Sequence, residues 1–181
     1  KEKIKAIVKK ENIPSAKVGD YLKTVFRPPF SSSPAPDEAY ADGAIAAEVI
    51  RMIDDLSQNN KPFFLAVGFK RPHLPFSAPQ KYWNFYNRAR MPLALFQERG
   101  SNIGRLAFKG PGEISKYPMD DRLYTTDNNG QLNLDEAFQR ELVHGYYACV
   151  SFIDFQIGKV VNKLKKKGLM DNTIIVIWGD H

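Results

Sequence analysis

Two cations and a histidine stand directly after an uncharged apolar run in this sequence. The run is Phe63–Phe69, and Lys70, Arg71, Pro72 and His73 follow it. A guanidinium group is a planar donor that suits a tetrahedral oxyanion, and an imidazole can take up or release a proton near neutral pH. The group therefore has the chemistry to bind and protonate an anion, although a loop histidine is more often simply hydrogen-bonded to backbone.

A second polar group follows another apolar run near the end of the sequence. Thr173–Trp178, TIIVIW, leads into Gly179, Asp180 and His181. A carboxylate oxygen beside an imidazole nitrogen is a reasonable half-site for a divalent cation. Taken alone, an Asp-His pair is a weak signal, because most such pairs bind no metal.

The two apolar runs predict buried strands of a parallel sheet, and each follows a predicted helix. The first helix is expected from Asp42, as its N-cap, to Leu56. The second is expected from Asn133, with Glu136 as capping-box partner, to about Lys167, and Gly168 would stop it.

The order helix, strand, excursion, helix, strand predicts an α/β fold, with a largely parallel sheet sandwiched between helices. The carboxyl ends of parallel strands lie at one edge, where ligands bind in open α/β sheets. We therefore expect His73 and the pair Asp180 and His181 to converge there.

The remaining segments are expected to be less regular. The prolines and serines of residues 21–36 predict a loop. The sequence APQKYWNFY predicts a short helix whose aromatic side chains pack on the core. Residues 74–132 otherwise predict an irregular excursion, and excursions of that length are usually functional.

Composition limits the classes of function. The 181 residues include 26 basic and 20 acidic side chains, a net charge of +6, which suits an anionic ligand without selecting nucleic acid over a sulfated or phosphorylated sugar. Cys149 is the single cysteine, so a disulfide within the chain is excluded. No run of 18 apolar residues is present, so no membrane span is predicted. The chain starts without a methionine and stops just after a strand, which suggests an excised fragment.

Three blocks together resemble the sulfatases of the alkaline-phosphatase superfamily, closest to the branch similar to iduronate-2-sulfatase. The blocks are PFFLAVGFKRPHLPF, HGYYACVSFIDFQIGKVVNKL and LMDNTIIVIWGDH, in this order. The resemblance implies a sulfuric ester hydrolase with a bound calcium ion and a sulfated small molecule or saccharide as substrate, without nucleic acid as a partner. It also implies a periplasmic, extracellular or lysosomal location.

The resemblance also implies roles for single residues. His73 would bind the sulfate group and assist the leaving group, Arg71 would contact the sulfate, and Asp180 and His181 would be metal ligands. The family often has lysine where this chain has Arg71, which makes that contact less secure than the others.

One part of the family pattern is missing from the chain. Sulfatases attack with a formylglycine made from the Cys or Ser of a C/S-x-P-x-R motif, and neither Cys149 nor Ser32-Ser33-Pro34-Ala35-Pro36 fits that motif. We therefore expect the nucleophile to lie outside this chain and the fragment alone to be inactive.

Two other functions stay open at this point. One is a phosphomonoester or phosphonate-ester hydrolase of the same superfamily. The other is a non-catalytic basic module that binds polyanions, which leaves the two polar strand ends unexplained. On the sulfatase hypothesis, we expect residues 1–181 to be part of one catalytic domain. Its parts would be a connecting segment (1–36), a helix-strand unit (37–73), an excursion near the site (74–132), and a long helix and strand ending in the metal half-site (133–181).

Overall fold

The computed structural model describes residues 28–59, 61–97, 112–117, 124–126 and 132–180, together with residues 9, 10, 12, 14, 17 and 18. Most of the predicted connecting segment, residues 98–111 of the excursion, and His181 lie outside the described residues. The elements used below are β1 (Phe30–Ser33), η2 (Asp37–Ala39), α3 (Ala41–Leu56), β2 (Phe76–Pro79), α4 (Gln80–Trp83), η3 (Arg88–Arg90), η5 (Gly112–Lys116), β3 (Tyr124–Thr126), β4 (Leu132–Leu134), α5 (Glu136–Lys166) and η7 (Met170–Asn172).

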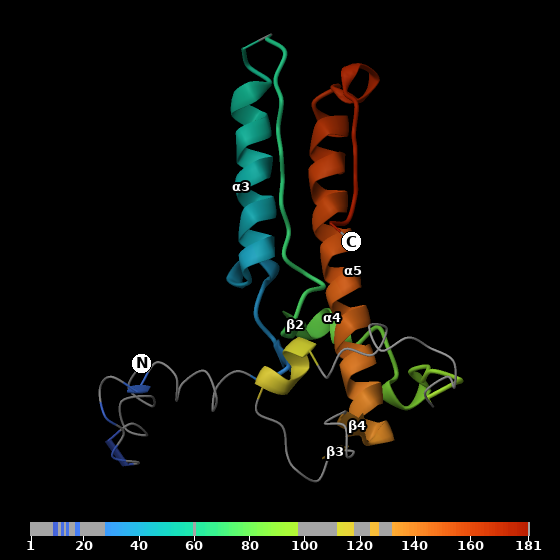
Figure 1. Ribbon diagram of the computed structural model, residues 1–181. Helices are drawn as coiled ribbons and strands as arrows, with labels where there is room; N and C mark the ends of the chain where they lie inside the picture. The colour runs from blue at the N-terminus through green and yellow to red at the C-terminus, as the bar shows by residue number, and fades with distance from the viewer. Residues whose placement is uncertain are drawn as a thin grey trace.

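Two helices that run in the same direction form the frame of the structure (Figure 1). After α3 the chain turns and residues 62–70 run back along that helix. After α5 it turns again at η7, and residues 173–180 run back along α5 (Figure 1). The two returning segments therefore point the same way. This is the arrangement that an α/β fold with two helix-strand units requires.

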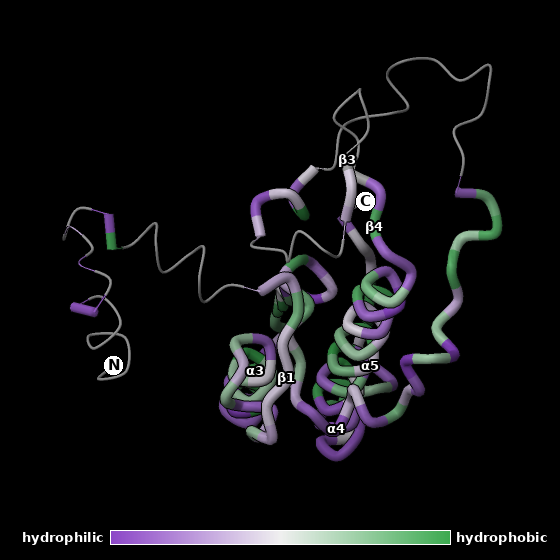
Figure 2. The backbone as a smooth tube through the Cα atoms, turned by 90° about the horizontal axis from the view of Figure 1, so that it is seen from below, coloured by the Kyte–Doolittle hydropathy of each residue, from purple (hydrophilic) through white to green (hydrophobic). Residues whose placement is uncertain are grey.

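A short parallel strand pair links the first of these units to the residues before it. β1 pairs with β2 in parallel, with Phe30 opposite Phe76, and Figure 2 shows β1 between α3 and α5. The hydroxyl oxygens of Ser31 and Ser77 lie 2.8 Å apart across the pair. The prediction of a loop over residues 21–36 was therefore wrong for Phe30–Ser33, because a tertiary ladder overrides the weak strand preference of serine.

The two predicted buried strands were wrong in their burial and pairing. In the part of the chain that the structure describes, strand pairing is limited to β1 with β2 and β3 with β4. Side chains of residues 62–70 alternate: Phe63 packs against a core cluster, whereas Phe64 is 92% exposed. In residues 173–180, Ile174 is 93% exposed.

The helix starts also differ from the prediction. Tyr40, not Asp42, is the N-cap of α3, and Asp42 lies within the first turn. Asp135, not Asn133, caps α5: its carboxylate accepts hydrogen bonds from the backbone N–H groups of Ala137 and Phe138. The predicted end of α5 is confirmed. Gly168 has a φ of +69°, which closes the last turn in the left-handed conformation that glycine favours.

The predicted short helix and its packing are confirmed by α4. Tyr82 and Trp83 are buried in a cluster with residues of β2 and α5. The other buried members of this cluster are Ala78, Ala148, Cys149 and Phe152. Tyr82 and Phe152 are among the largest fully buried side chains, so this contact anchors α4 to the long helix.

A buried carboxylate beside this cluster joins three separate elements. Asp37 of η2 is 3% exposed. It lies 2.8 Å from the ammonium groups of both Lys81 and Lys159, and it accepts hydrogen bonds from Tyr82 and Gln156. Burial alone would raise the pKa of Asp37, but the hydrogen bonds from these four side chains outweigh it and lower the pKa to about 2.

Replacing Asp37 with Asn should destabilise the protein. The free energy of unfolding should fall by about 2 kcal/mol. Both ion pairs disappear, and the hydrogen bonds that Tyr82 and Gln156 donate to this side chain become weaker. The carboxylate stabilises the folded state fully above its ordinary pKa of 3.8, and that stability is lost as pH falls through about 2. Denaturant unfolding of the intact protein at pH 7 and pH 3 measures both effects.

Glu38→Gln is the matched control for this substitution. Glu38 is the next residue, is exposed and lies 3.4 Å from Lys159, so its loss should change stability by less than about 0.5 kcal/mol. An Asp37→Asn protein as stable as the Glu38→Gln protein would contradict the role given to Asp37.

Candidate functional site

The loop that carries His73 is fixed to the first turn of α3 by a carboxylate. Asp42 is 3% exposed and accepts hydrogen bonds from the backbone N–H of Lys70 at 2.8 Å and of Arg71 at 3.2 Å. Two peptide groups that would otherwise need partners are thereby satisfied. The buried carboxylate of Asp42 on α3 therefore fixes the backbone of Lys70 and Arg71, where the loop begins.

The side chain of Arg71 braces the same loop from within. Its Nε donates to the carbonyl oxygen of Ser77 at 3.1 Å, and its Nη1 donates to the carbonyl oxygen of His73 at 3.1 Å. Two positions of the donor fork are therefore used by the backbone. In this structure Arg71 supports the loop, and its predicted contact with a sulfate group remains a prediction.

The imidazole of His73 is held in one orientation. Its Nδ1 lies 2.7 Å from the carbonyl oxygen of Leu74, and because a carbonyl only accepts, Nδ1 carries the hydrogen. Nε2 points away from this contact and lies 3.4 Å from a carboxylate oxygen of Glu113 in η5. A carboxylate therefore lies beside the ring nitrogen that does not contact Leu74.

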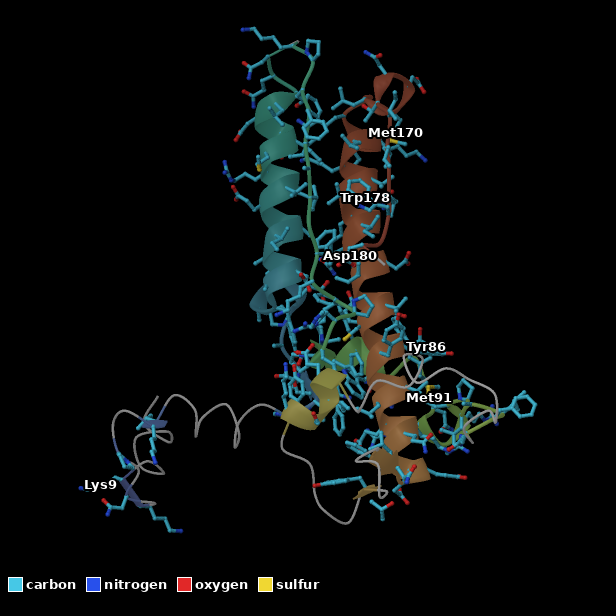
Figure 3. The ribbon with its side chains drawn as sticks, viewed as in Figure 1. Lys9, Tyr86, Met91, Met170, Trp178 and Asp180 are labelled. Atoms are coloured by element: carbon cyan, nitrogen blue, oxygen red, sulfur yellow. The ribbon has the colours of Figure 1, made fainter. Side chains whose placement is uncertain are left out.

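The predicted metal half-site is described only in part. Asp180 lies at the end of the second returning segment, beside the middle of α5 (Figure 3). His181 lies outside the described residues. Across the described part of the chain, no cluster of three or more His, Cys, Asp or Glu side chains could hold a metal ion. The carboxylate of Asp180 fits a hard cation such as calcium as one oxygen ligand, and a complete site needs ligands from elsewhere.

Cys149 does not have the properties of a nucleophile. It is fully buried in the middle of α5, in the cluster around Tyr82. Burial raises the pKa of the Cys149 thiol to about 12; the positive charge of Arg71 acts against this and the carboxylate of Asp42 adds to it. Since the thiolate is the reactive form, this thiol is inert at neutral pH. The expectation that the nucleophile is another residue agrees with this geometry.

Another histidine, His144, is buried and has a structural role. His144 on α5 donates from Nε2 to the carbonyl oxygen of Trp83 at 2.8 Å, and its ring stands edge-on to the Trp83 ring. Arg88 lies 3.5 Å from Nδ1 and forms an ion pair with Glu141 at 2.7 Å. These contacts join the end of α4 to α5.

Two residues of the candidate site escaped the sequence analysis. Asp42 was assigned to helix capping, and the DG dipeptide at a helix start gives no hint that the carboxylate faces a loop 28 residues away. Glu113 lies 40 residues from His73 in an irregular segment, and no sequence pattern marks it.

Comparison with known proteins identifies the family. The Sulfatase family model matches residues 5–181, which is nearly the whole chain. The chain belongs to the sulfatase family, whose α/β fold is that of the alkaline-phosphatase superfamily. The predicted fold class is therefore confirmed, and the described strands and helices are a part of that domain.

Individual relatives agree with this membership. A sulfatase of Formosa agariphila is 34% identical over 132 residues, which are 72% of this chain and 24% of the relative. Iduronate 2-sulfatase of Mus musculus is 29% identical over 153 residues, 84% of this chain and 27% of the relative. The multifunctional alkaline phosphatase superfamily protein PehA of Trinickia caryophylli is 30% identical over 129 residues, 68% of this chain and 24% of the relative. The chain thus spans about a quarter of the length of these relatives.

No described helix is both long enough and apolar enough to cross a membrane.

The inertness of Cys149 can be measured directly. In the folded protein at pH 8, iodoacetamide should leave Cys149 unmodified, whereas the unfolded protein should be fully modified, because burial withholds both the thiolate and access to it. Peptide mapping by mass spectrometry, applied to the peptide that contains Cys149, reports the modified fraction. Rapid labelling in the folded state would contradict the burial and the raised pKa.

Proposed function

We propose that the protein containing this chain is a sulfuric ester hydrolase that cleaves a sulfate monoester, with His73 as a catalytic residue. The observation that carries the proposal is the orientation of His73. Its Nδ1 donates to the carbonyl of Leu74, so its Nε2 is the nitrogen that meets an anion. Membership of the sulfatase family supplies the reaction class.

The residues of this chain would act on the sulfate group and on the departing oxygen. Protonated Nε2 of His73 would donate a hydrogen bond to the ester. As the sulfur–oxygen bond breaks, it would pass its proton to the bridging oxygen, which leaves as an alcohol. Lys70 and the remaining donors of Arg71 would add positive charge on the same loop. Together these groups would stabilise a dianionic transition state more than water does.

Two components of the reaction would come from beyond the described residues. A formylglycine in the part of the protein outside this chain would supply the nucleophile, and a calcium ion held in part by Asp180 and His181 would offset the charge of the sulfate group. The carboxylate oxygens of Asp180 suit a hard cation. His181 is the next residue in sequence and would offer an imidazole nitrogen beside them. On this proposal the present residues form part of a single catalytic domain and are inactive by themselves.

The substrate class that fits is a sulfated small molecule or saccharide. The relatives named iduronate 2-sulfatase and choline-sulfatase act, by their names, on substrates of these two kinds. The location that accompanies this function in the family is periplasmic, extracellular or lysosomal.

A phosphomonoester or phosphonate-ester hydrolase of the same superfamily is the second candidate. One observation favours it: PehA, which matches over 68% of this chain, is named as a multifunctional protein of the superfamily. A tetrahedral phosphate ester presents the same oxygens to His73 and Arg71. Turnover of 4-nitrophenyl sulfate and 4-nitrophenyl phosphate by the intact protein, compared side by side, decides between the two.

Replacing His73 with Ala in the intact protein should lower kcat/KM for sulfate esters by about 10²- to 10⁴-fold. The loss should be larger for phenyl sulfate than for 4-nitrophenyl sulfate, because nitrophenolate leaves without needing a proton. Lys61→Ala removes an exposed cation at the far end of the same segment and is the control. Unchanged turnover without His73 would sink the assignment.

Replacing Asp180 with Asn, or His181 with Ala, should weaken calcium binding by more than about tenfold. The readout is the rise in Tm of the intact protein as calcium is added, which follows binding without any turnover. Asp171→Asn changes an exposed carboxylate of η7, the turn before the same returning segment, and should leave the calcium response unchanged. An equal response in the Asp180→Asn and Asp171→Asn proteins would refute the ligand assignment.

A further inference from the structure

We infer that Asp42 is the positioning residue for His73: its carboxylate sets the start of the loop that aims the imidazole. The inference rests on the proposed function of His73. Asp42 does not touch the imidazole, and it acts through the peptide groups of Lys70 and Arg71, which donate to its two carboxylate oxygens at 2.8 and 3.2 Å.

The geometry separates this role from ordinary helix capping. A capping side chain accepts from N–H groups of its own helix, and the N-cap of α3 is Tyr40. Both oxygens of Asp42 instead accept from residues 28 and 29 positions further along the chain. Because the carboxylate is almost completely buried, water cannot replace it as the acceptor without a large rearrangement.

Asp42 is itself held rigidly. The neighbouring Gly43 packs so closely on η2 that a Cβ at that position would lie 2.0 Å from the carbonyl oxygen of Asp37. The side chain of Asp37 is fixed in turn by Lys81 and Lys159. The first turn of α3 therefore cannot shift along η2, and the position of the Asp42 carboxylate is set by the core.

A continuous set of hydrogen bonds leads from Asp42 to the backbone of His73. The peptide N–H of His73 donates to the carbonyl of Lys70 at 3.0 Å, so the first residue held by Asp42 also holds His73. Arg71, the second, reaches from its side chain to the carbonyls of His73 and Ser77. Releasing Lys70 and Arg71 would loosen each of these contacts at once.

The charge of Asp42 suits a site for an anion. Its two oxygens accept hydrogen bonds from two peptide N–H groups, which stabilise the negative charge, and the carboxylate is buried. A carboxylate at this place can therefore fix a loop that binds sulfate without repelling the sulfate. Its effect on the reaction should depend wholly on His73.

The test is a double-mutant cycle in the intact protein, with kcat/KM measured for phenyl sulfate and for 4-nitrophenyl sulfate. Asp42→Asn keeps the shape but turns an amide N–H₂ toward one peptide donor. It should lower kcat/KM at least about tenfold for phenyl sulfate and less for 4-nitrophenyl sulfate, the same bias as His73→Ala. In the His73→Ala background, Asp42→Asn should cause no further loss. Asp55→Asn, an exposed carboxylate of the same helix, is the control and should leave both rates unchanged.

The outcomes separate the two claims. Equal losses on both substrates, or a full further loss in the His73→Ala background, would show a purely structural role and overturn the inference alone. Normal turnover by the His73→Ala protein would overturn the proposed function of His73, and this inference with it.

A second measurement covers the case in which Asp42→Asn does not fold. Hydrogen exchange followed by mass spectrometry on the unmodified protein should show slow exchange at the amides of Lys70 and Arg71, although Lys70 is exposed. Asp42→Glu keeps both oxygens on a longer arm and should retain part of that protection and of the phenyl sulfate activity. Fast exchange at both amides in the unmodified protein would overturn the inference.

Discussion

The buried carboxylate of Asp37 is the contact on which the rest of the described structure depends. It brings η2, α4 and α5 together, segments separated by up to 122 residues in sequence. An unpaired carboxylate at 3% exposure would be costly, so the two lysines, Tyr82 and Gln156 are required by it and not merely near it. Because its pKa is about 2, this group is ionised at neutral pH. Because Gly43 lies against Asp37, the same contact fixes the start of α3, and through Asp42 the loop of His73.

The returning segments show how packing divides a sequence pattern. Residues 63–69 are apolar at almost every position, but their side chains alternate between the cluster of α3 and α5 and the outside. Val49, Ile53 and Leu164 form that cluster, and Asp54 ties the ends of the two helices through Lys163 and Lys167. A segment with apolar side chains on both faces is expected to be packed against other residues on both faces. The described residues supply cover for one, and the chain is about a quarter as long as its relatives.

The sequence predicted what depends on periodicity and local chemistry, and missed what depends on tertiary contacts. Both helices, the stop at Gly168 and the packing of Tyr82 and Trp83 follow from spacing and residue type. The pairing of β1 with β2 escaped because three serines give no strand signal without their partner. The role of Asp42 escaped for a similar reason: a carboxylate in a first helical turn is explained well enough by the helix itself. At the candidate site, His73 and Arg71 were found by type, whereas the acceptors that orient them are backbone carbonyls, which no sequence displays.

The charges of the loop that carries Arg71 and His73 explain why this loop alone is not a sufficient anion site. Arg71 already donates from two of its nitrogens to backbone carbonyl oxygens. What the loop offers an anion is Nε2 of His73 and the exposed ammonium group of Lys70. In water-exposed surroundings these contribute little, since exposed ion pairs yield about 1 kcal/mol or less. A doubly charged transition state needs a stronger, fixed cation. The other returning segment points the same way along the helices and ends in Asp180, whose carboxylate would be an oxygen ligand for such a cation on the proposed function. On the proposed function, the charge of the reacting group as well as the α/β fold would therefore favour bringing these two segment ends together.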